Sequence, residues 1–108
     1  NLADWANALA VAPATANALG KFANGIADEI VSCTWMACDC PKLVAPAMNS
    51  RMWNNSAVRE NCSLLADKQD TRFIGPVEGP LAEDRSGMGR LAPVEDIVEG
   101  IIELNTTR

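Results

Sequence analysis

The fold is decided by residues 44–53, which read VAPAMNSRMW. A short apolar run, residues 43–45, stops at Pro46; a polar and sulfur-rich elbow follows, and residues 53–56 begin a predicted helix. In an open α/β sheet, ligands bind just beyond the carboxyl ends of the strands, so this elbow is where a binding site is expected. An ordinary strand-to-helix connection, with a Met and a Trp in the core, fits the same residues.

A second elbow follows an earlier apolar run. Residues 8–12 are apolar without interruption and end at Pro13, which predicts a strand buried on both faces, as in a parallel sheet. Asn17 is expected to cap the helix that comes next, because its side chain can accept from exposed N–H groups. Elbows on two neighbouring parallel strands face the same crevice, so the two together outline a binding site.

The rest of the chain alternates between helical and extended patterns. Apolar residues recur at helical spacing over residues 19–30, 57–67 and 93–102, and residues 72–74 predict a third strand. Residues 77–90 are rich in glycine, proline and charge, and predict a mobile loop that serves as a lid rather than a core element. This order of elements predicts a parallel sheet with helices on both faces. Three strands are few for such a sheet, so its other half is expected upstream or on another polypeptide.

Two glycines interrupt the first helical segment. Gly20 and Gly25 each weaken a helix, so they suggest that something approaches closely at these positions, either a neighbouring helix or a flat ligand. A second helical segment is expected from Asp28 to Ala37, and residues 2–6 are expected to form one helical turn.

The composition narrows the class of protein. The chain has 108 residues, of which 48% are hydrophobic, and a net charge of −5. An acidic chain lacks the basic surface that nucleic acid requires, and no apolar run is long enough to cross a membrane. We expect one soluble cytoplasmic domain that binds neither nucleic acid nor membrane.

The residues for several common chemistries are missing. The chain contains no His, so a Ser-His or Cys-His pair cannot form within it, and no glycine-rich phosphate-binding motif is present. Cys38 and Cys40 are too closely spaced for the usual zinc site, so no metal is expected. The four cysteines, which also include Cys33 and Cys62, are expected to be reduced, as in the cytosol.

The two elbows closely resemble a known family. Residues 13–18 read Pro-Ala-Thr-Ala-Asn-Ala, which is similar to the motif Pro-Ala-Ser-Ala-Asn-Thr, and residues 46–53 match Pro-x-Met-Asn-x-x-Met-Trp in full. Both motifs are typical of the homo-oligomeric flavin-containing cysteine decarboxylases. That family includes phosphopantothenoylcysteine decarboxylase of coenzyme A synthesis and the peptide decarboxylases of lantibiotic-type pathways. The resemblance covers essentially the whole chain.

The resemblance implies a fold, a cofactor and a set of roles. Residues 1–108 would be the C-terminal portion of a single flavodoxin-like (Rossmann-like) domain, a three-layer parallel α/β sheet, assembled as trimers or dodecamers with FMN at a subunit boundary. FMN would oxidise the cysteine thiol toward a thioaldehyde, so that carbon dioxide leaves and an aminoenethiol remains. Asn49 would be the catalytic residue, orienting the substrate carboxylate. The implied cofactor-binding residues are Pro13, Ala14, Thr15, Ala16 and Asn17, and the implied substrate-binding residues are Met48, Asn49, Met52, Glu83 and Arg85.

Two departures from the family pattern affect these implications. The family's catalytic His would fall just upstream of Asn1, and its FMN-phosphate loop would also lie in the absent half. In the substrate clamp, about residues 77–90, Glu83 stands where phosphopantothenoylcysteine decarboxylases usually carry a Cys that reduces the enethiol. An enzyme without that Cys is expected to stop at the enethiol, which favours a peptide with a C-terminal cysteine as substrate. Phosphopantothenoylcysteine is the alternative, and a non-catalytic flavin-binding or regulatory subunit is a third.

Overall fold

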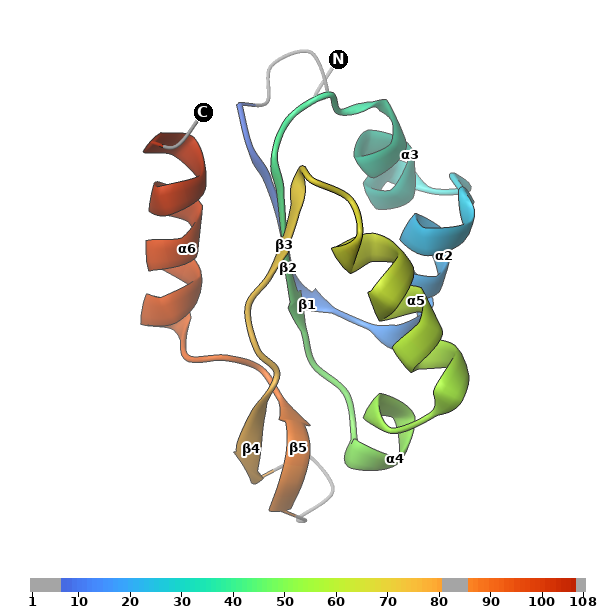
Figure 1. Cartoon of the computed structure of the whole chain (residues 1–108), viewed down its shortest axis with the longest axis vertical. Coiled ribbons are helices and arrows are strands. Elements are labelled where there is room, and N and C mark those ends of the chain that lie inside the picture. The colour runs from blue at the N-terminus through green and yellow to red at the C-terminus, as the bar shows by residue number, and fades with distance from the viewer. Residues whose placement is uncertain (1–6, 81–85, 107–108) are drawn as a thin grey trace.

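A computed structural model describes residues 7–80 and 86–106 of the chain (Figure 1). The described chain contains five strands and five helices. In order, the elements are β1 (Leu9–Ala14), α2 (Ala16–Asn24), α3 (Ile30–Ala37), β2 (Lys42–Pro46), α4 (Ser50–Trp53), α5 (Ser56–Ala66), β3 (Thr71–Phe73), β4 (Val77–Pro80), β5 (Ser86–Arg90) and α6 (Val94–Thr106).

The main sheet is parallel and has β2 at its centre. Its order is β1-β2-β3, and Val44 of β2 lies opposite Val11 of β1 on one side and Phe73 of β3 on the other. Every residue of β2 is buried. The expectation of a strand buried on both faces is wrong for β1, in which Ala10, Ala12 and Pro13 are exposed, because β1 lies at the edge of the described sheet.

Helices cover both faces of this sheet, as the alternating pattern predicts. Helices α2, α3 and α5 lie on one face and α6 on the other (Figure 1). The larger core, between the sheet and the three helices, includes Leu19, Phe22, Trp35, Val44 and Leu65. The smaller core, between the sheet and α6, includes Leu43, Ala45, Ile97 and Leu104. The α/β three-layer architecture is therefore confirmed.

The helix boundaries differ from the prediction at two places. Asn17 lies inside the first turn of α2, and Thr15 is the N-cap residue instead, its hydroxyl oxygen accepting from the Ala18 N–H at 3.1 Å. Helix α2 also ends before the end of the apolar stripe over residues 19–30, because Gly25 takes the left-handed conformation (φ 71°) at its C-cap, and the second helical segment expected from Asp28 to Ala37 is found as α3. Helix α3 then begins with a capping box in which Glu29 and Ser32 bond each other's backbone.

The two ends of the segment expected to form a lid pair with each other as a β-hairpin. The prediction of a loop over residues 77–90 is wrong for β4 and β5, which pair antiparallel, whereas residues 81–85 lie outside the described residues. Backbone hydrogen bonds hold such a hairpin and do not require apolar side chains, so a segment rich in glycine gave no strand signal. The helical turn expected over residues 2–6 also lies outside the described residues.

The cysteines are not all reduced. Cys38 and Cys40 form a disulfide in the turn between α3 and β2, where their Cα atoms lie 5.5 Å apart, within the usual range for such a bond. The expectation of four reduced thiols is wrong for this pair, because the turn brings two nearby cysteines together at that distance. Cys33 and Cys62 are free thiols.

A buried lysine joins this turn to the next one. Lys42 donates to the carbonyl oxygens of Cys38 at 2.9 Å and Cys40 at 3.2 Å, and to the Asp70 carboxylate at 3.2 Å. Burial raises the pKa of Asp70, but the hydrogen bonds from Lys42 and Thr71 outweigh burial, and the net effect is a lowered pKa. None of the helices in the described part of the chain is long and apolar enough to cross a membrane.

Candidate functional site

The two elbows lie side by side at the carboxyl ends of β1 and β2. The Ala47 N–H donates to the Ala14 carbonyl oxygen at 3.1 Å, so a hydrogen bond joins the two elbows directly. The register between the strands shifts after Val11, and Ala14 then lies opposite Pro46. The juxtaposition expected from the sequence is therefore present in the structure.

The first elbow presents small side chains and one amide. Pro13, Thr15 and Asn17 are exposed, Ala16 is half-buried and Ala14 is buried in the core. The Thr15 hydroxyl already serves as the helix cap. Because Thr15 takes that position, the Asn17 side chain makes no hydrogen bond with any other described residue and remains available to a ligand.

The second elbow holds the predicted catalytic amide in a fixed orientation. Asn49 is the N-cap of α4, and its Oδ1 accepts from the Met52 N–H at 2.9 Å. An N-cap bond of this kind fixes the rotamer of the capping side chain. Met48 and Asn49 are half-buried, and Met52 is exposed. The three predicted substrate-binding residues of this elbow therefore lie within one turn of chain.

The hairpin is attached to the second elbow through a glycine. The Met48 N–H donates to the Gly89 carbonyl oxygen at 2.9 Å. Gly89 has φ +135°, and a Cβ at this position would overlap the Met48 carbonyl oxygen. The sequence did not lead us to expect this contact between Gly89 and Met48. The closely spaced Gly87 and Gly89 were the local feature that could have indicated it. The predicted clamp residues Glu83 and Arg85 lie outside the described residues.

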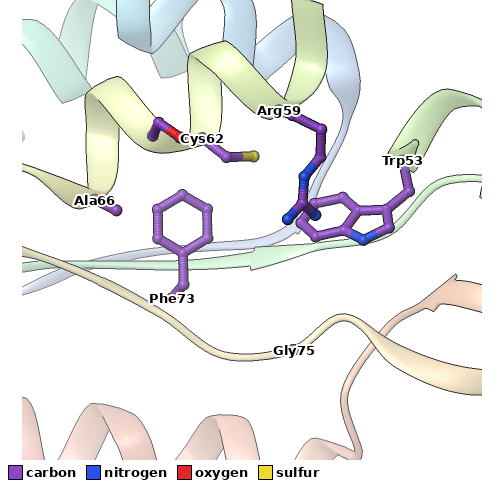
Figure 2. Close-up of a pocket in the computed structure, with 7 residues that line it drawn as sticks. Trp53, Arg59, Cys62, Ala66, Phe73 and Gly75 are labelled. Atoms are coloured by element: carbon purple, nitrogen blue, oxygen red, sulfur yellow. The ribbon is translucent and has the colours of Figure 1, made fainter. Parts of the chain in front are cut away.

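A pocket lies beside the second elbow, between α5 and the end of β3 (Figure 2). Its volume is about 280 Å³. The Arg59 guanidinium lies 4.6 Å from the centre of the Trp53 ring, a cation–π distance. Phe73 points from β3 toward α5, and the Cys62 sulfur is directed into the space between Phe73 and Arg59 (Figure 2). The lining residues are Trp53, Arg59, Cys62, Ser63, Ala66, Phe73 and Gly75.

The charge at this pocket is positive. Burial raises the pKa of the Cys62 thiol, and the nearby Arg59 charge offsets part of that increase, so the thiol is neutral at pH 7. Among the described residues that line the pocket, Arg59 carries a positive charge and none carries a carboxylate. Sequence reasoning placed Trp53 in the elbow but missed Arg59 and Phe73, since no local pattern links residues so far apart in the chain. Among the described residues, no group of three or more His, Cys, Asp and Glu could hold a metal.

A family model described as Flavoprotein matches residues 1–106. The chain belongs to the Flavoprotein family. It is 48% identical over 97 residues to the coenzyme A biosynthesis bifunctional protein CoaBC of Bacillus subtilis (strain 168). The matched region covers 90% of this chain and 24% of that protein. The resemblance to flavin-containing cysteine decarboxylases that the two motifs carry is confirmed by this family match and by the relatives.

Solved structures support the same family and the flavodoxin-like fold. A mutant PPC decarboxylase complexed with pantothenoylaminoethenethiol has a TM-score of 0.88 and 36% identity, covering 93% of this chain and 56% of that one. The FMN-dependent cysteine decarboxylase SpaF has a TM-score of 0.75 and 34% identity, covering 92% of this chain and 52% of that one. The chain thus spans about half the length of these solved chains and about a quarter of the Bacillus relative.

Proposed function

We propose that the protein carrying this chain catalyses the FMN-dependent oxidative decarboxylation of a cysteine carboxylate to an aminoenethiol. The observation that carries the proposal is the hydrogen bond between Ala47 and Ala14, which joins the two family motifs into one surface at the carboxyl ends of β1 and β2. Membership of the Flavoprotein family and the likeness to an FMN-dependent cysteine decarboxylase support it.

The first elbow fits one edge of a flavin. Its small residues allow a flat ring to approach the backbone, and the exposed Asn17 amide offers both a donor and an acceptor to the polar edge of such a ring. Pro13, Ala14, Thr15, Ala16 and Asn17 would hold FMN, which supplies the two-electron oxidation of the cysteine thiol when bound. The sequence has no glycine-rich phosphate loop, so residues outside this chain would hold the FMN phosphate.

Asn49 would position the substrate carboxylate. The Asn49 amide nitrogen would be the donor to this carboxylate, and its Oδ1 accepts from the Met52 N–H. A neutral donor binds the carboxylate without a strong ion pair, which would otherwise stabilise the negative charge that decarboxylation must remove. Met48 and Met52 would line this position and exclude water, which favours loss of carbon dioxide from a carboxylate.

Each of two substrates has observations in its favour. Glu83, at the place of the family's clamp Cys, favours a product that stays at the enethiol, as expected for a peptide with a C-terminal cysteine. The 48% identity to the Bacillus coenzyme A protein and the TM-score of 0.88 to PPC decarboxylase favour phosphopantothenoylcysteine. A homotrimeric or homododecameric assembly in the cytoplasm is part of the same proposal. The exposed Ile26, before α3, and the exposed Ile30 and Val31, which begin it, would be covered in such an assembly.

The test is a product assay on the flavin-loaded protein. Purified protein is given phosphopantothenoylcysteine or a peptide ending in cysteine, and the products are separated and weighed by mass spectrometry. Loss of carbon dioxide and two hydrogens from the peptide would give the enethiol that the proposal expects, whereas loss of carbon dioxide alone from phosphopantothenoylcysteine would give the saturated thiol of the coenzyme A enzyme. A protein that binds flavin and converts neither substrate would instead be a non-catalytic flavin-binding or regulatory subunit.

A further inference from the structure

The pocket between α5 and β3 adjoins the place where the substrate carboxylate would bind. Trp53 belongs to both, since it ends the second elbow and forms one wall of the pocket. The backbone N–H of Trp53 donates to the backbone carbonyl oxygen of Asn49 at 3.0 Å, so Trp53 follows Asn49 by one helical turn. A substrate held at Asn49 by its cysteine carboxylate could therefore extend its other end into this pocket.

The cation in this pocket is held in place and has no anionic partner in the described part of the chain. Arg59 lies 4.6 Å from the centre of the Trp53 ring, which limits the freedom of its exposed side chain. The ion pairs of the described residues involve Lys21, Lys42 and Arg72, and none involves Arg59. A guanidinium without an ion-pair partner is suited to bind an anion through charge-assisted hydrogen bonds.

The other walls suit an aliphatic chain. Phe73, Cys62 and Ala66 provide apolar surface, and the Cys62 thiol adds no charge at pH 7 because burial raises its pKa. Gly75 leaves one side of the pocket without a side chain. The volume of about 280 Å³ is close to the lower limit for small-molecule sites, enough for the end of a substrate rather than for a whole one.

We propose that this pocket binds a phosphate monoester at the end of the substrate arm remote from the reacting cysteine, with Arg59 as the residue that selects for it. A guanidinium presents paired N–H donors that match a phosphate, and stacking on Trp53 orients that pair. The inference rests on the proposed function with phosphopantothenoylcysteine as substrate. A phosphate monoester could also come from FMN, so the experiment separates these two sources.

The experiment compares one substrate with and without its phosphate. The kcat and KM of the flavin-loaded protein are measured with phosphopantothenoylcysteine and with pantothenoylcysteine, for wild type, Arg59→Met and Arg59→Lys. The control is Lys68→Met, which removes the same charge from an exposed position outside the pocket. Arg59→Met is expected to raise KM for phosphopantothenoylcysteine roughly ten- to a hundredfold, the range for a charge-assisted hydrogen bond. Its kcat for that substrate, and its KM for pantothenoylcysteine, should stay at the wild-type values. Arg59→Lys should be intermediate and Lys68→Met unchanged.

Three results would overturn the proposal. Arg59→Met could raise KM equally for both substrates, or it could leave both KM values unchanged. It could also lower the flavin content of the protein, which would mean that Arg59 binds the phosphate of FMN. If wild type converts neither of these two compounds, phosphopantothenoylcysteine is not its substrate. The cysteine-terminated peptide then tests the proposed function, and the pocket is tested by itself. Phosphopantothenate is titrated while tryptophan fluorescence is followed, since an anion at Arg59 alters the surroundings of Trp53. Saturable binding that Arg59→Met weakens would support the pocket, and no binding would refute it.

Discussion

Replacing Gly89 with Ala should detach the base of the hairpin from the second elbow. Gly89 has φ +135°, a conformation that residues with a side chain rarely adopt, and the added Cβ would overlap the Met48 carbonyl oxygen. The strained conformation costs about 1–3 kcal/mol and the lost hydrogen bond from the Met48 N–H about 1 kcal/mol, so local opening should become roughly 2–4 kcal/mol easier. KM for the substrate should rise if this hairpin carries the proposed substrate clamp, while bound flavin should be retained.

Hydrogen exchange at the Met48 amide measures this change directly. A loss of 2–4 kcal/mol corresponds to exchange about thirty- to several-hundredfold faster in Gly89→Ala than in wild type. Gly20→Ala is the matched control, because a Cβ at Gly20 meets only Asn61 Nδ2 at 3.5 Å, an ordinary contact, inside helix α2. That control should be neutral or stabilise the protein by up to about 1 kcal/mol. Unchanged exchange at Met48 and unchanged KM in Gly89→Ala would show that Gly89 does not hold the hairpin against the second elbow.

Three further predictions concern the elbows and the buried lysine. Asn49→Asp keeps the oxygen that caps α4 but places a negative charge against the substrate carboxylate, so turnover should be lost while stability and flavin absorbance persist; turnover by this variant would disprove the role of Asn49. Thr15→Ala removes the α2 cap and should lower the free energy of unfolding by about 1 kcal/mol in urea titrations, whereas Thr15→Ser should restore it. The pKa of Asp70 is lowered from 3.8 because its bonds to Lys42 and Thr71 outweigh burial, so its contribution to stability is full above about pH 4 and is lost as the pH falls through the lowered value. Asp70→Asn should flatten this acid dependence, and an identical acid profile in the variant would contradict the assignment.

Much of the fold follows from the sequence because its signals are local. The apolar runs before Pro13 and Pro46 predict two strands that end at elbows, and in the structure these strands are neighbours. The last helix is predicted from Pro93 and its apolar stripe, and it is found as Val94–Thr106. Prolines, caps and helical spacing act over a few residues, so one sequence suffices to detect them.

The features that the sequence did not predict depend on distant parts of the chain. The exposure of β1 depends on what lies beside that strand, and the base of the hairpin depends on pairing across residues 81–85. The contact of Gly89 with Met48 and the meeting of Arg59, Trp53 and Phe73 join residues from different elements. A cap is harder to assign where two candidates compete: Thr15 and Asn17 are both good capping residues, and the backbone conformation at Thr15 decides between them.

The most direct test of the proposed function is the mass of the product formed by the purified, flavin-loaded protein from a cysteine-terminated substrate. The proposed function predicts a product that has lost carbon dioxide and two hydrogens, formed by wild type and not by Asn49→Asp. A protein that carries flavin and returns both phosphopantothenoylcysteine and the peptide unchanged would contradict it.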